Sequence, residues 1–328
     1  MTTASLPGSN PFAQILTTSK KMLSLFQFIE VVAPTEEPVL IFGETGVGKE
    51  LFARAIHDAS GRKGQYVAIN LGGVEDAMLA DTLFGHSDGA YTGAEDKRAG
   101  LCHTARGGTL FLDEIGDLSH SSQVKLLRLL ENGEYYPLGV DTPHQNEARI
   151  VAATNKDLSS LVEVGKFRRD LLYRLSTFQI TVPPLRDRKE DLPILCTHWL
   201  KEEMETIPTK SLTSEAIRLL SEYSFPGNVR ELRRILLRAR ILCPGDSIEG
   251  DLVSTLLKET DYDGHRSERN VTSIVFPEKL PTIRVLIDEL IKEALRRSEG
   301  RQNEAAAMLG ITRQALSKRL KQQRSFYP

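Results

Sequence analysis

The sequence has few cysteine and aromatic residues and no long apolar run. Its three cysteines, Cys102, Cys196 and Cys243, lie far apart, which fits neither a disulfide framework nor a zinc site. Because we expect no disulfide bonds, a reducing compartment is the natural setting, and we expect a cytoplasmic protein. Because no run of about 18 apolar residues occurs, we predict no membrane span. The N-terminus also lacks the basic and apolar regions of a secretory signal.

Charge is nearly balanced over the 328 residues, with a formal net charge of −2, but it is unevenly distributed. Residues 281–328 contain ten lysine or arginine and five aspartate or glutamate residues, whereas the rest of the chain contains 32 and 39. A small basic tail on an acidic body indicates nucleic-acid contact at the C-terminus. A merely solvated tail would have the same composition.

Short β-rich apolar runs alternate with helical patterns over the first half of the chain. Continuous apolar runs separated by helices predict an α/β domain whose parallel sheet is covered on both faces. From residue 185 to about residue 257 the pattern is helical only, and the polar, aperiodic residues 264–270 predict a linker. The apolar runs occupy residues 39–42, 66–69, 109–112, 150–153 and 178–182, and the clearest helical patterns residues 194–204 and 229–241.

A phosphate-binding pattern follows the first predicted strand. Residues 43–50 read GETGVGKE, which is G-x-x-x-x-G-K between a strand and a helix. Backbone N–H groups of such a loop surround phosphate oxygens, and the N-terminus of the helix adds positive charge. We expect Lys49 to reach the β- and γ-phosphates. The predicted nucleotide-binding residues here are Gly43, Glu44, Thr45, Gly46, Val47, Gly48, Lys49 and Glu50.

Two carboxylates stand at the C-terminal end of the predicted strand 109–112, where ligands bind in open α/β sheets. Asp113 is suited to Mg²⁺, and Glu114 is suited to polarising an attacking water. Because Glu50 stands where the common loop has serine or threonine for Mg²⁺, the metal would depend mainly on Asp113 and water. The alternative is that Asp113 only caps a helix.

A glycine-rich segment, HSDGAYTGAEDK at residues 86–97, places an aromatic residue on a predicted surface loop. Burial of a large apolar side chain stabilises a protein by about 1.5–3 kcal/mol, so an exposed Tyr91 points to a functional role.

The chain resembles the AAA+ ATPases that activate sigma-54-dependent transcription, the bacterial enhancer-binding proteins. The resemblance covers about residues 10–321, and its most specific motif is GAYTGA at residues 89–94, where the family has GAFTGA. Glu50 is usual in that family. Together, the residue patterns and the resemblance predict a tail (1–9), an AAA+ α/β subdomain (10–184), an AAA+ helical lid (185–257), a linker (258–280) and a Fis-like helix-turn-helix domain (281–328).

The same resemblance implies how the site residues divide their work, with ATP as the nucleotide. Asn70 resembles the residue that hydrogen-bonds the glutamate corresponding to Glu114 and switches it with nucleotide state. Asn155, in VAATN, resembles the γ-phosphate sensor, and Arg230, in FPGNVREL, resembles the nucleotide contact of the lid. The loop would contact sigma-54, chiefly through Tyr91 and Thr92. Its residues are Gly89, Ala90, Tyr91, Thr92, Gly93 and Ala94.

The segment GKFRRDLLYRL at residues 165–175 resembles the family's arginine-finger segment, with Arg168 and Arg174 at the finger positions. An arginine from a neighbouring subunit stabilises the transferring phosphoryl group, so self-association, as a homo-oligomer and by resemblance a hexamer, would be part of the chemistry. A hetero-oligomer would serve equally. The alternative for the basic cluster, which includes Arg169, is a solvated face or a DNA patch.

Several positions depart from the family pattern. Tyr91 replaces phenylalanine, and Phe225 replaces the usual tryptophan but remains an aromatic anchor. Pro137 replaces an arginine, which puts any role of that arginine in loop coupling in doubt. Arg301 stands where asparagine is common.

The C-terminal pattern is typical of a helix-turn-helix. A second helix is predicted at residues 302–309, Gly310 makes the turn, and Thr312 caps a final helix whose start would read bases in a major groove. A dimerisation or docking helix is the alternative. The first helix carries an apolar stripe of Ile283, Leu286, Ile287, Leu290, Ile291, Ala294 and Leu295. The predicted DNA-binding residues are Thr312, Arg313, Gln314, Ser317, Lys318 and Lys321.

The expected function is therefore an ATP-hydrolysing activator that binds enhancer DNA and remodels the closed complex of sigma-54 RNA polymerase holoenzyme. Because few residues precede the resemblance, we expect no N-terminal regulatory domain and control by a protein acting in trans. Two alternatives stay open: a DNA-binding regulator that has lost this output, and another AAA+ remodeller such as a helicase loader.

Overall fold

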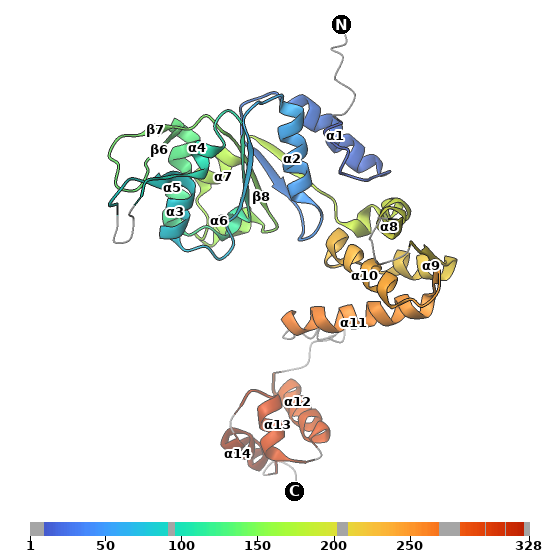
Figure 1. The fold of residues 1–328 in the computed structure, drawn as a ribbon. Coiled ribbons are helices and arrows are strands. Elements are labelled where there is room, and N and C mark those ends of the chain that lie inside the picture. The colour runs from blue at the N-terminus through green and yellow to red at the C-terminus, as the bar shows by residue number, and fades with distance from the viewer. Residues whose placement is uncertain are drawn as a thin grey trace. The chain divides into compact units, whose positions relative to one another are not determined.

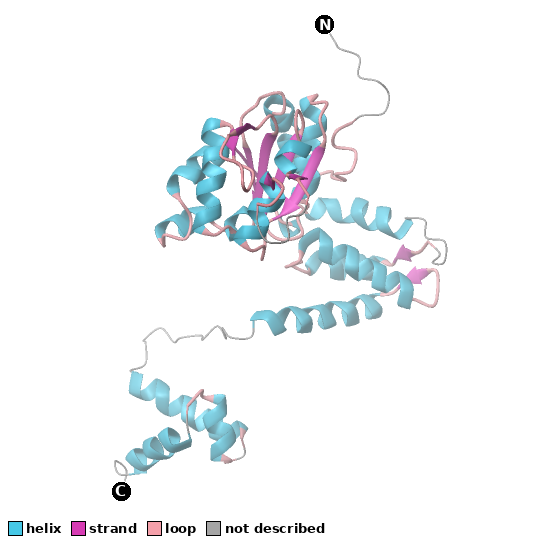
Figure 2. Cartoon of the chain, turned by 60° about the vertical axis from the view of Figure 1, so that its left-hand side comes forward, coloured by secondary structure: helices cyan, strands magenta, loops and turns pink. Residues whose placement is uncertain are grey.

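The structure, a computed structural model, describes residues 10–90, 96–201, 209–268, 283–298, 300–311 and 313–324. The chain forms two compact units, Met1–Tyr262 and Asp263–Pro328. The first contains a parallel sheet with flanking helices, followed by a helical subdomain, and the second is helical (Figures 1 and 2). None of the described helices has the length and hydropathy to cross a membrane.

Five strands form the sheet in the order β2-β5-β8-β1-β9. Strand β1 is parallel to both of its neighbours. Its first residue, Val39, pairs with Val151 of β8 on one side and with Phe178 of β9 on the other. Each strand coincides with one of the predicted apolar runs, and the predicted α/β fold is confirmed. The strands are β1 (Val39–Phe42), β2 (Tyr66–Asn70), β5 (Thr109–Asp113), β8 (Arg149–Thr154) and β9 (Phe178–Thr181).

Helices cover both faces of the sheet, which explains why the strands read as continuous apolar runs. Adjacent residues of β1 point to opposite faces: Ile41 packs in the cluster that contains Phe52, and Leu40 packs in the cluster that contains Leu126. The first face is covered by α1 (Lys20–Val32) and α2 (Lys49–Ser60), and the second by α3 (Asp76–Phe84), α5 (His120–Asn132), α6 (Leu158–Glu163) and α7 (Arg169–Leu175).

Short elements join these helices and strands. Strands β3 (Gly85–His86) and β4 (Arg98–Ala99) pair antiparallel at the base of the GAYTGA loop, and β6 (Glu134–Tyr135) pairs antiparallel with β7 (His144–Gln145). Helix α4 (Leu101–Thr104) and the 3₁₀ turn η1 (Ile115–Asp117) complete the domain.

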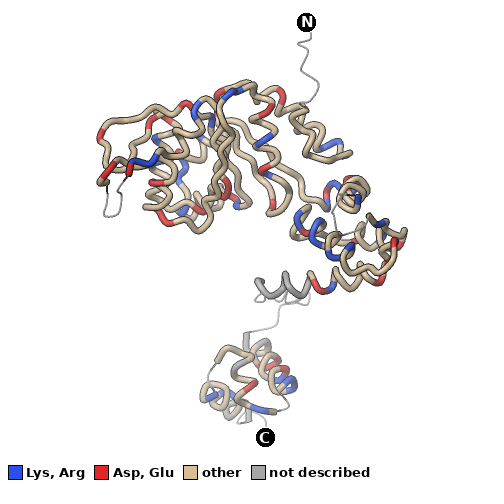
Figure 3. Tube along the Cα trace, viewed as in Figure 1, with Lys and Arg blue, Asp and Glu red and all other residues tan. Residues whose placement is uncertain are grey.

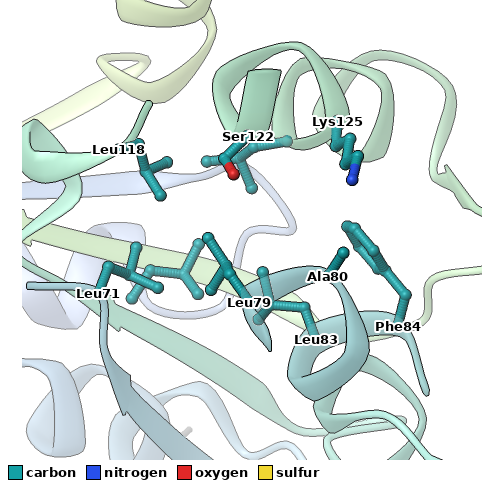
Figure 4. A pocket seen from close by; sticks show the side chains of 10 residues that line it. Leu71, Leu79, Ala80, Leu83, Phe84, Leu118, Ser122 and Lys125 are labelled. Atoms are coloured by element: carbon teal, nitrogen blue, oxygen red, sulfur yellow. The ribbon is translucent and has the colours of Figure 1, made fainter. Parts of the chain in front are cut away.

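A small apolar cavity of about 10 Å³ lies between α3 and α5, with Leu71 and Leu118 on opposite sides of it (Figure 4). Leu79, Leu83 and Phe84 line it from α3, and Lys125 from α5. This volume is near that needed by one water molecule, so the cavity is a packing feature of the core.

The helical subdomain has its own apolar core, which includes Leu220, Leu232 and Leu256. Helix α11 continues to Glu268, beyond residue 257, where a linker was predicted. Its first turn past residue 257 is held by polar contacts, which apolar periodicity does not record: Arg238 pairs with Glu259, and buried Thr260 donates to the Leu256 carbonyl. The elements are η2 (Leu185–Asp187), η3 (Lys189–Asp191), α8 (Leu192–Lys201), β10 (Ser211–Leu212), α9 (Ser214–Glu222), α10 (Asn228–Leu242), β11 (Ser247–Ile248) and α11 (Gly250–Glu268).

The second unit has the helical pattern predicted for residues 281–328. Helices α12 (Ile283–Arg297), α13 (Gln302–Met308) and α14 (Arg313–Arg324) enclose a small core that includes Ile291, Ala305 and Leu316. The side chain of Leu290 is 47% exposed, so the apolar stripe of α12 is narrower than predicted. Gly310, with a φ of 64°, makes the turn before α14.

Candidate nucleotide-binding site

The phosphate loop connects β1 to α2 and depends on its glycines. Gly46 and Gly48 have φ values of 80° and 103°, which residues with a side chain rarely adopt. A Cβ on Gly43 would lie 3.1 Å from the Val182 carbonyl oxygen. The Lys49 ammonium group donates to the Gly43 carbonyl oxygen over 3.0 Å, and this residue is only 7% exposed. The loop therefore holds its lysine inside the cavity that the predicted phosphates would enter.

The two predicted carboxylates lie at the C-terminal end of β5. Asn70, at the end of β2, pairs in register with Asp113, whose carboxylate accepts from the Glu114 N–H over 2.9 Å. Glu114 has a left-handed backbone, with a φ of 56°. Its Oε2 is buried and has no hydrogen-bond partner among the described residues. A buried carboxylate oxygen without a partner is costly unless a ligand or water satisfies it, so this pair fits a site for water and metal.

Asn70 lies next to the carboxylates, but its side-chain oxygen accepts from the Gly72 N–H over 2.8 Å. Asn70 and Glu114 line the same cavity, but no described contact is the hydrogen bond between them that the family resemblance implies. Asn155, after β8, does reach the phosphate loop, because its amide donates to the Thr45 hydroxyl over 2.9 Å.

A cavity of about 500 Å³ brings most of the predicted nucleotide residues together. A nucleotide needs a cleft of about this size, with an apolar part for the base and a polar part for the phosphates. Its polar part includes Thr45, Gly46, Val47, Gly48, Lys49, Glu50, Asn70, Asp113, Glu114, Arg188, Arg230 and Arg233, and its other walls include Ile15, Leu16, Leu195, His198, Trp199 and Val229.

The helical subdomain is docked on the phosphate loop through the start of α10. Asn228, fully buried, donates to the Glu44 carboxylate and to the Thr45 carbonyl, both over 3.1 Å, and accepts from the Leu185 N–H. The Arg230 N–H donates to the Gly46 carbonyl over 3.3 Å. Helix α10 carries several arginines (Figure 3), of which Arg230 and Arg233 line the cavity.

The chain adopts an unfavourable backbone where it enters α10. Phe225 and Asn228 have φ values of 49° and 53°, and Glu231 supports the turn by accepting from the Gly227 N–H over 2.7 Å. Phe225 is buried and lies edge-on to Tyr223, so it packs as an aromatic anchor. Asparagine tolerates a left-handed backbone better than most residues, and this property of the PGN sequence was the signal for Asn228 that the sequence analysis missed.

Two arginine side chains that the sequence did not predict also contact the phosphate loop. Arg186 forms a two-pronged ion pair with Glu44, at 2.6 and 2.8 Å, and this guanidinium holds the pKa of Glu44 below its ordinary value. Buried Arg188 donates to the Val47 carbonyl over 3.0 Å and lies beside Asp191. Asp191 in turn accepts from the N–H groups of Thr18 and Ser19 at the start of α1.

The predicted arginine fingers lie on the sheet face covered by α7, and the lining of the described cavity includes neither. Arg168 forms an ion pair with Asp170 at 2.6 Å. Arg174 donates to the Leu130 carbonyl over 2.9 Å and lies 3.9 Å from Glu37. Neither arginine can therefore serve the nucleotide cavity of its own chain in this arrangement.

The other predicted contact residues are only partly described. Gly89, with a φ of 72°, and Ala90 belong to the described base of the loop, whereas Tyr91, Thr92, Gly93 and Ala94 lie outside the described residues. In α14, Arg313 and Gln314 are exposed and Ser317 is half-buried. Thr312 and the side chains of Lys318 and Lys321 lie outside the described part.

Three family models match successive parts of the chain. Residues 15–181 match the sigma-54 interaction domain, residues 186–270 the AAA+ ATPase lid domain, and residues 288–322 the Fis family of bacterial regulatory proteins.

The relatives are similar over most of the chain. The DNA-binding transcriptional regulator NtrC of Rhizobium meliloti is 38% identical over 330 residues, covering 93% of this chain and 68% of the relative. The transcriptional regulatory protein ZraR of Escherichia coli is 40% identical over 305 residues, covering 92% of this chain and 67% of the relative. The crystal structure of NtrX from Brucella abortus in complex with ATP has a TM-score of 0.68 at 30% identity, covering 94% of this chain and 69% of that one.

Proposed function

The chain belongs to the family of sigma-54-dependent transcription activators, and we propose that it couples ATP hydrolysis to remodelling of the closed complex of sigma-54 RNA polymerase. The three matched domains are those that this function requires. They are an AAA+ core, which implies ATPase activity, a lid and a Fis-type helix-turn-helix. The observation that best supports this proposal is that the phosphate loop, the carboxylates after β5 and the lid all line one cavity.

In this proposal ATP binds with its phosphates against the loop. Lys49 would leave the Gly43 carbonyl and bind the β- and γ-phosphates, since a buried ammonium group needs an anionic or polar partner. Glu114 would orient and polarise the attacking water with the oxygen that now has no described partner. Asp113 would hold Mg²⁺, which supplies charge neutralisation to the phosphates when bound.

Two polar residues would report the state of the nucleotide. Asn155 already bonds to Thr45 of the loop, which supports its role as the γ-phosphate sensor. Asn70 would exchange its bond to Gly72 for one to Glu114 in one nucleotide state. Arg230 would contact the phosphates from the lid, and its N–H bond to Gly46 supports that position.

Hydrolysis would require a neighbouring subunit. Arg168 and Arg174 lie away from the cavity of their own chain, so their charge would act on the nucleotide of the adjacent subunit. We propose a ring, by family resemblance a hexamer, of identical or mixed subunits.

The contacts with the two macromolecular partners, sigma-54 and DNA, would lie in different domains. The GAYTGA loop, Gly89 to Ala94, would bind sigma-54, with Tyr91 and Thr92 at the contact. The start of α14 would bind enhancer DNA, with exposed Arg313 and Gln314 able to read base edges. Contacts to the phosphates and sugars of the DNA backbone would come from Thr312, Ser317, Lys318 and Lys321.

A trapping experiment tests this proposal. Purified protein is incubated with sigma-54 and ADP–aluminium fluoride, which mimics the transferring phosphoryl group, and complexes are separated on a native gel. We expect a complex with the wild-type protein and none with Thr92→Ala. If a protein that hydrolyses ATP traps no sigma-54, the proposed target is wrong.

A further inference from the structure

Gln123 is a fully buried polar residue of α5, the helix that follows the turn after Glu114. Helix α5 packs beside α7 (Figure 1), which begins directly after the predicted finger Arg168. The side-chain nitrogen of Gln123 donates to the carbonyl oxygens of Leu118 and Lys166, each over 2.9 Å. Its side-chain oxygen accepts from the Arg168 N–H over 2.8 Å. One buried side chain therefore joins the turn after Glu114 to the segment that carries Arg168.

The three partners of Gln123 fix the orientation of its amide. A main-chain carbonyl can only accept a hydrogen bond, and a main-chain N–H can only donate one. Because two of the partners are carbonyls and the third is an N–H, a single placement of the amide nitrogen and oxygen satisfies all three. A side chain that cannot both donate and accept would leave buried main-chain groups without these partners, which is unfavourable.

The turn after Glu114 is held by contacts that do not involve Gln123. The Asp117 N–H donates to the Glu114 carbonyl over 3.0 Å, and the Asp117 carboxylate forms an ion pair with Lys156, just after β8. Ile115, within the same turn, is fully buried in the core. A substitution of Gln123 should therefore leave the turn, and with it Glu114, in place.

The segment before α7 depends on Gln123 more directly. Gln123 binds the peptide groups on both sides of Phe167, because the Lys166 carbonyl belongs to one and the Arg168 N–H to the other. Phe167 itself is buried, and its N–H donates to the Leu161 carbonyl over 3.1 Å. Loss of the Gln123 amide would thus leave Phe167 anchored but free the peptide group that leads to Arg168. Rotation of that peptide group would redirect Arg168.

We propose that Gln123 is a positioning residue that holds Arg168 in the orientation needed to act on the nucleotide of the adjacent subunit. This inference rests on the proposed action of Arg168 in trans. The Arg168 guanidinium, which pairs with Asp170 in this structure, would turn toward the neighbouring phosphates while its backbone stays fixed by Gln123. The effect of Gln123 should then be confined to the subunit that donates the finger.

The test mixes two variants of the full-length protein that should each be inactive alone. Glu114→Gln subunits can donate a finger but cannot hydrolyse ATP, and Arg168→Ala subunits can hydrolyse ATP but cannot donate this finger. Turnover by the mixture then comes from Arg168→Ala recipients beside Glu114→Gln donors. Gln123→Met, which has a side chain of similar size but no amide, is added first to the donor and then to the recipient.

Gln123→Met in the donor should lower turnover of the mixture at least about tenfold, since a displacement of about 1 Å can cost a catalysed reaction about 100-fold. The same substitution in the recipient should leave turnover nearly unchanged. ATP binding by both Gln123→Met proteins, followed by the fluorescence of the cavity residue Trp199, should also be unchanged. Gln145→Met, the same substitution at an exposed position of β7, should have no effect in donor or recipient.

Gln123→Asn provides a second donor test if a thermal melt shows that Gln123→Met folds poorly. Its amide is one methylene shorter and cannot reach all three partners, so turnover should fall with the substituted donor and not with the substituted recipient. Equal losses in donor and recipient for both variants would show that Gln123 only stabilises the fold, and would overturn the inference. Unchanged turnover with the Gln123→Met donor would overturn it as well.

The mixture without any change at Gln123 separates this inference from the proposed function. If that mixture is inactive, or if Arg168→Ala alone hydrolyses ATP at the wild-type rate, the proposed action of Arg168 in trans is wrong and the inference fails with it. If the mixture is active and substitution of Gln123 in the donor makes no difference, only the positioning role fails.

Discussion

Asn228 of the lid donates a hydrogen bond to Glu44 of the phosphate loop over 3.1 Å, although 183 residues separate them in the chain. The same side chain is fully buried and also bonds to Thr45 and Leu185. A movement of the phosphate loop when nucleotide binds must therefore either carry the lid with it or break these buried bonds. This contact explains how occupancy of the cavity would change the position of the lid.

Gly46 should be sensitive to substitution, because the phosphate loop lies very close to the start of α10 in the lid. A Cβ on Gly46 would lie 2.3 Å from the Gly227 carbonyl oxygen, and its φ of 80° is unfavourable for alanine. We expect Gly46→Ala to push the lid away and to weaken ATP binding by at least about tenfold, or about 1.4 kcal/mol. The fluorescence of Trp199, the single tryptophan and a cavity residue, provides the titration signal.

Gly61→Ala is the matched control for this substitution. Gly61 ends α2 with a φ of 72°, but nothing lies within 4 Å of its Cβ position. It should lose about 1–2 kcal/mol of stability from the left-handed backbone alone and bind ATP normally. Equal ATP affinities for the two variants would show that contact between the lid and the loop is unimportant for binding.

Acid should weaken the junction between α3 and α5. Hydroxyl groups of Ser119, Ser121 and Ser122 donate to Asp76 and lower its pKa to about 2, well below the value of about 3.9 in an unfolded chain. This stabilisation is present above about pH 4 and is lost as the pH falls toward about 2. Because the carboxylate is solvent-accessible, we expect it to contribute less than about 1 kcal/mol.

Urea denaturation at several pH values measures this effect. Asp76→Asn should be less stable than the wild-type protein near pH 6, and the difference should shrink as the pH falls below about 4. Asp141→Asn, an exposed position in the loop before β7, serves as the control. A difference between Asp76→Asn and wild type that stays constant with pH would contradict the assigned role of the three serines.

Glu114→Gln should separate ATP binding from ATP hydrolysis. The substitution keeps the size of the side chain but removes the carboxylate that would polarise water, so hydrolysis should fall at least about 100-fold. Affinity for ATP should change little. Steady-state turnover and the Trp199 titration measure the two properties, and Glu163→Gln at an exposed position of α6 is the control. Retained turnover would move the water-polarising role to another residue.

The location of Arg174 on α7 predicts complementation between inactive variants. Arg174→Ala should lower turnover about 1,000-fold, as expected for a finger in trans. It should cost about 1–3 kcal/mol of stability, because it removes the hydrogen bond to the Leu130 carbonyl, whereas the ion pair with Glu37 is exposed and long. A mixture of Arg174→Ala with Glu114→Gln should regain activity, since some interfaces then combine an intact Glu114 with an intact Arg174.

Arg169→Ala controls for loss of positive charge in the same segment, because its exposed side chain lies outside the finger positions. It should retain turnover. If the mixture of Arg174→Ala and Glu114→Gln stayed inactive at concentrations that support oligomers, the finger would have to be assigned to Arg168 or to another residue.

The sequence was sufficient for those features that depend on neighbouring residues. The strand at residues 39–42 and the glycines at Gly46 and Gly48 are local patterns, and the structure has each of them. The carboxylates Asp113 and Glu114 follow directly after a buried strand, so their place at the sheet edge was also predictable.

Contacts between distant segments were not predictable in this way. Arg186 and Arg188 approach the phosphate loop only when the lid is folded against it, and their local sequence does not mark them. The PGN sequence indicates the left-handed backbone of Asn228 but not its hydrogen-bond partners in the loop. Asp81 and His86 are five residues apart, but the bond from His86 to Asp96 forms only when the loop returns. Likewise, the turn of α11 that follows residue 257 makes polar contacts, which apolar periodicity does not record.

The most direct test of the central claim is open-complex formation on a sigma-54 promoter. Sigma-54 holoenzyme is bound to the promoter, the protein is added at high concentration, and DNA melting is followed by permanganate reactivity. With ATP, melting near the start site should appear for the wild-type protein and be absent for Glu114→Gln. With a non-hydrolysable ATP analogue neither protein should melt the promoter. Melting without hydrolysis, or no melting by a protein that hydrolyses ATP, would contradict the coupling of this ATPase to sigma-54.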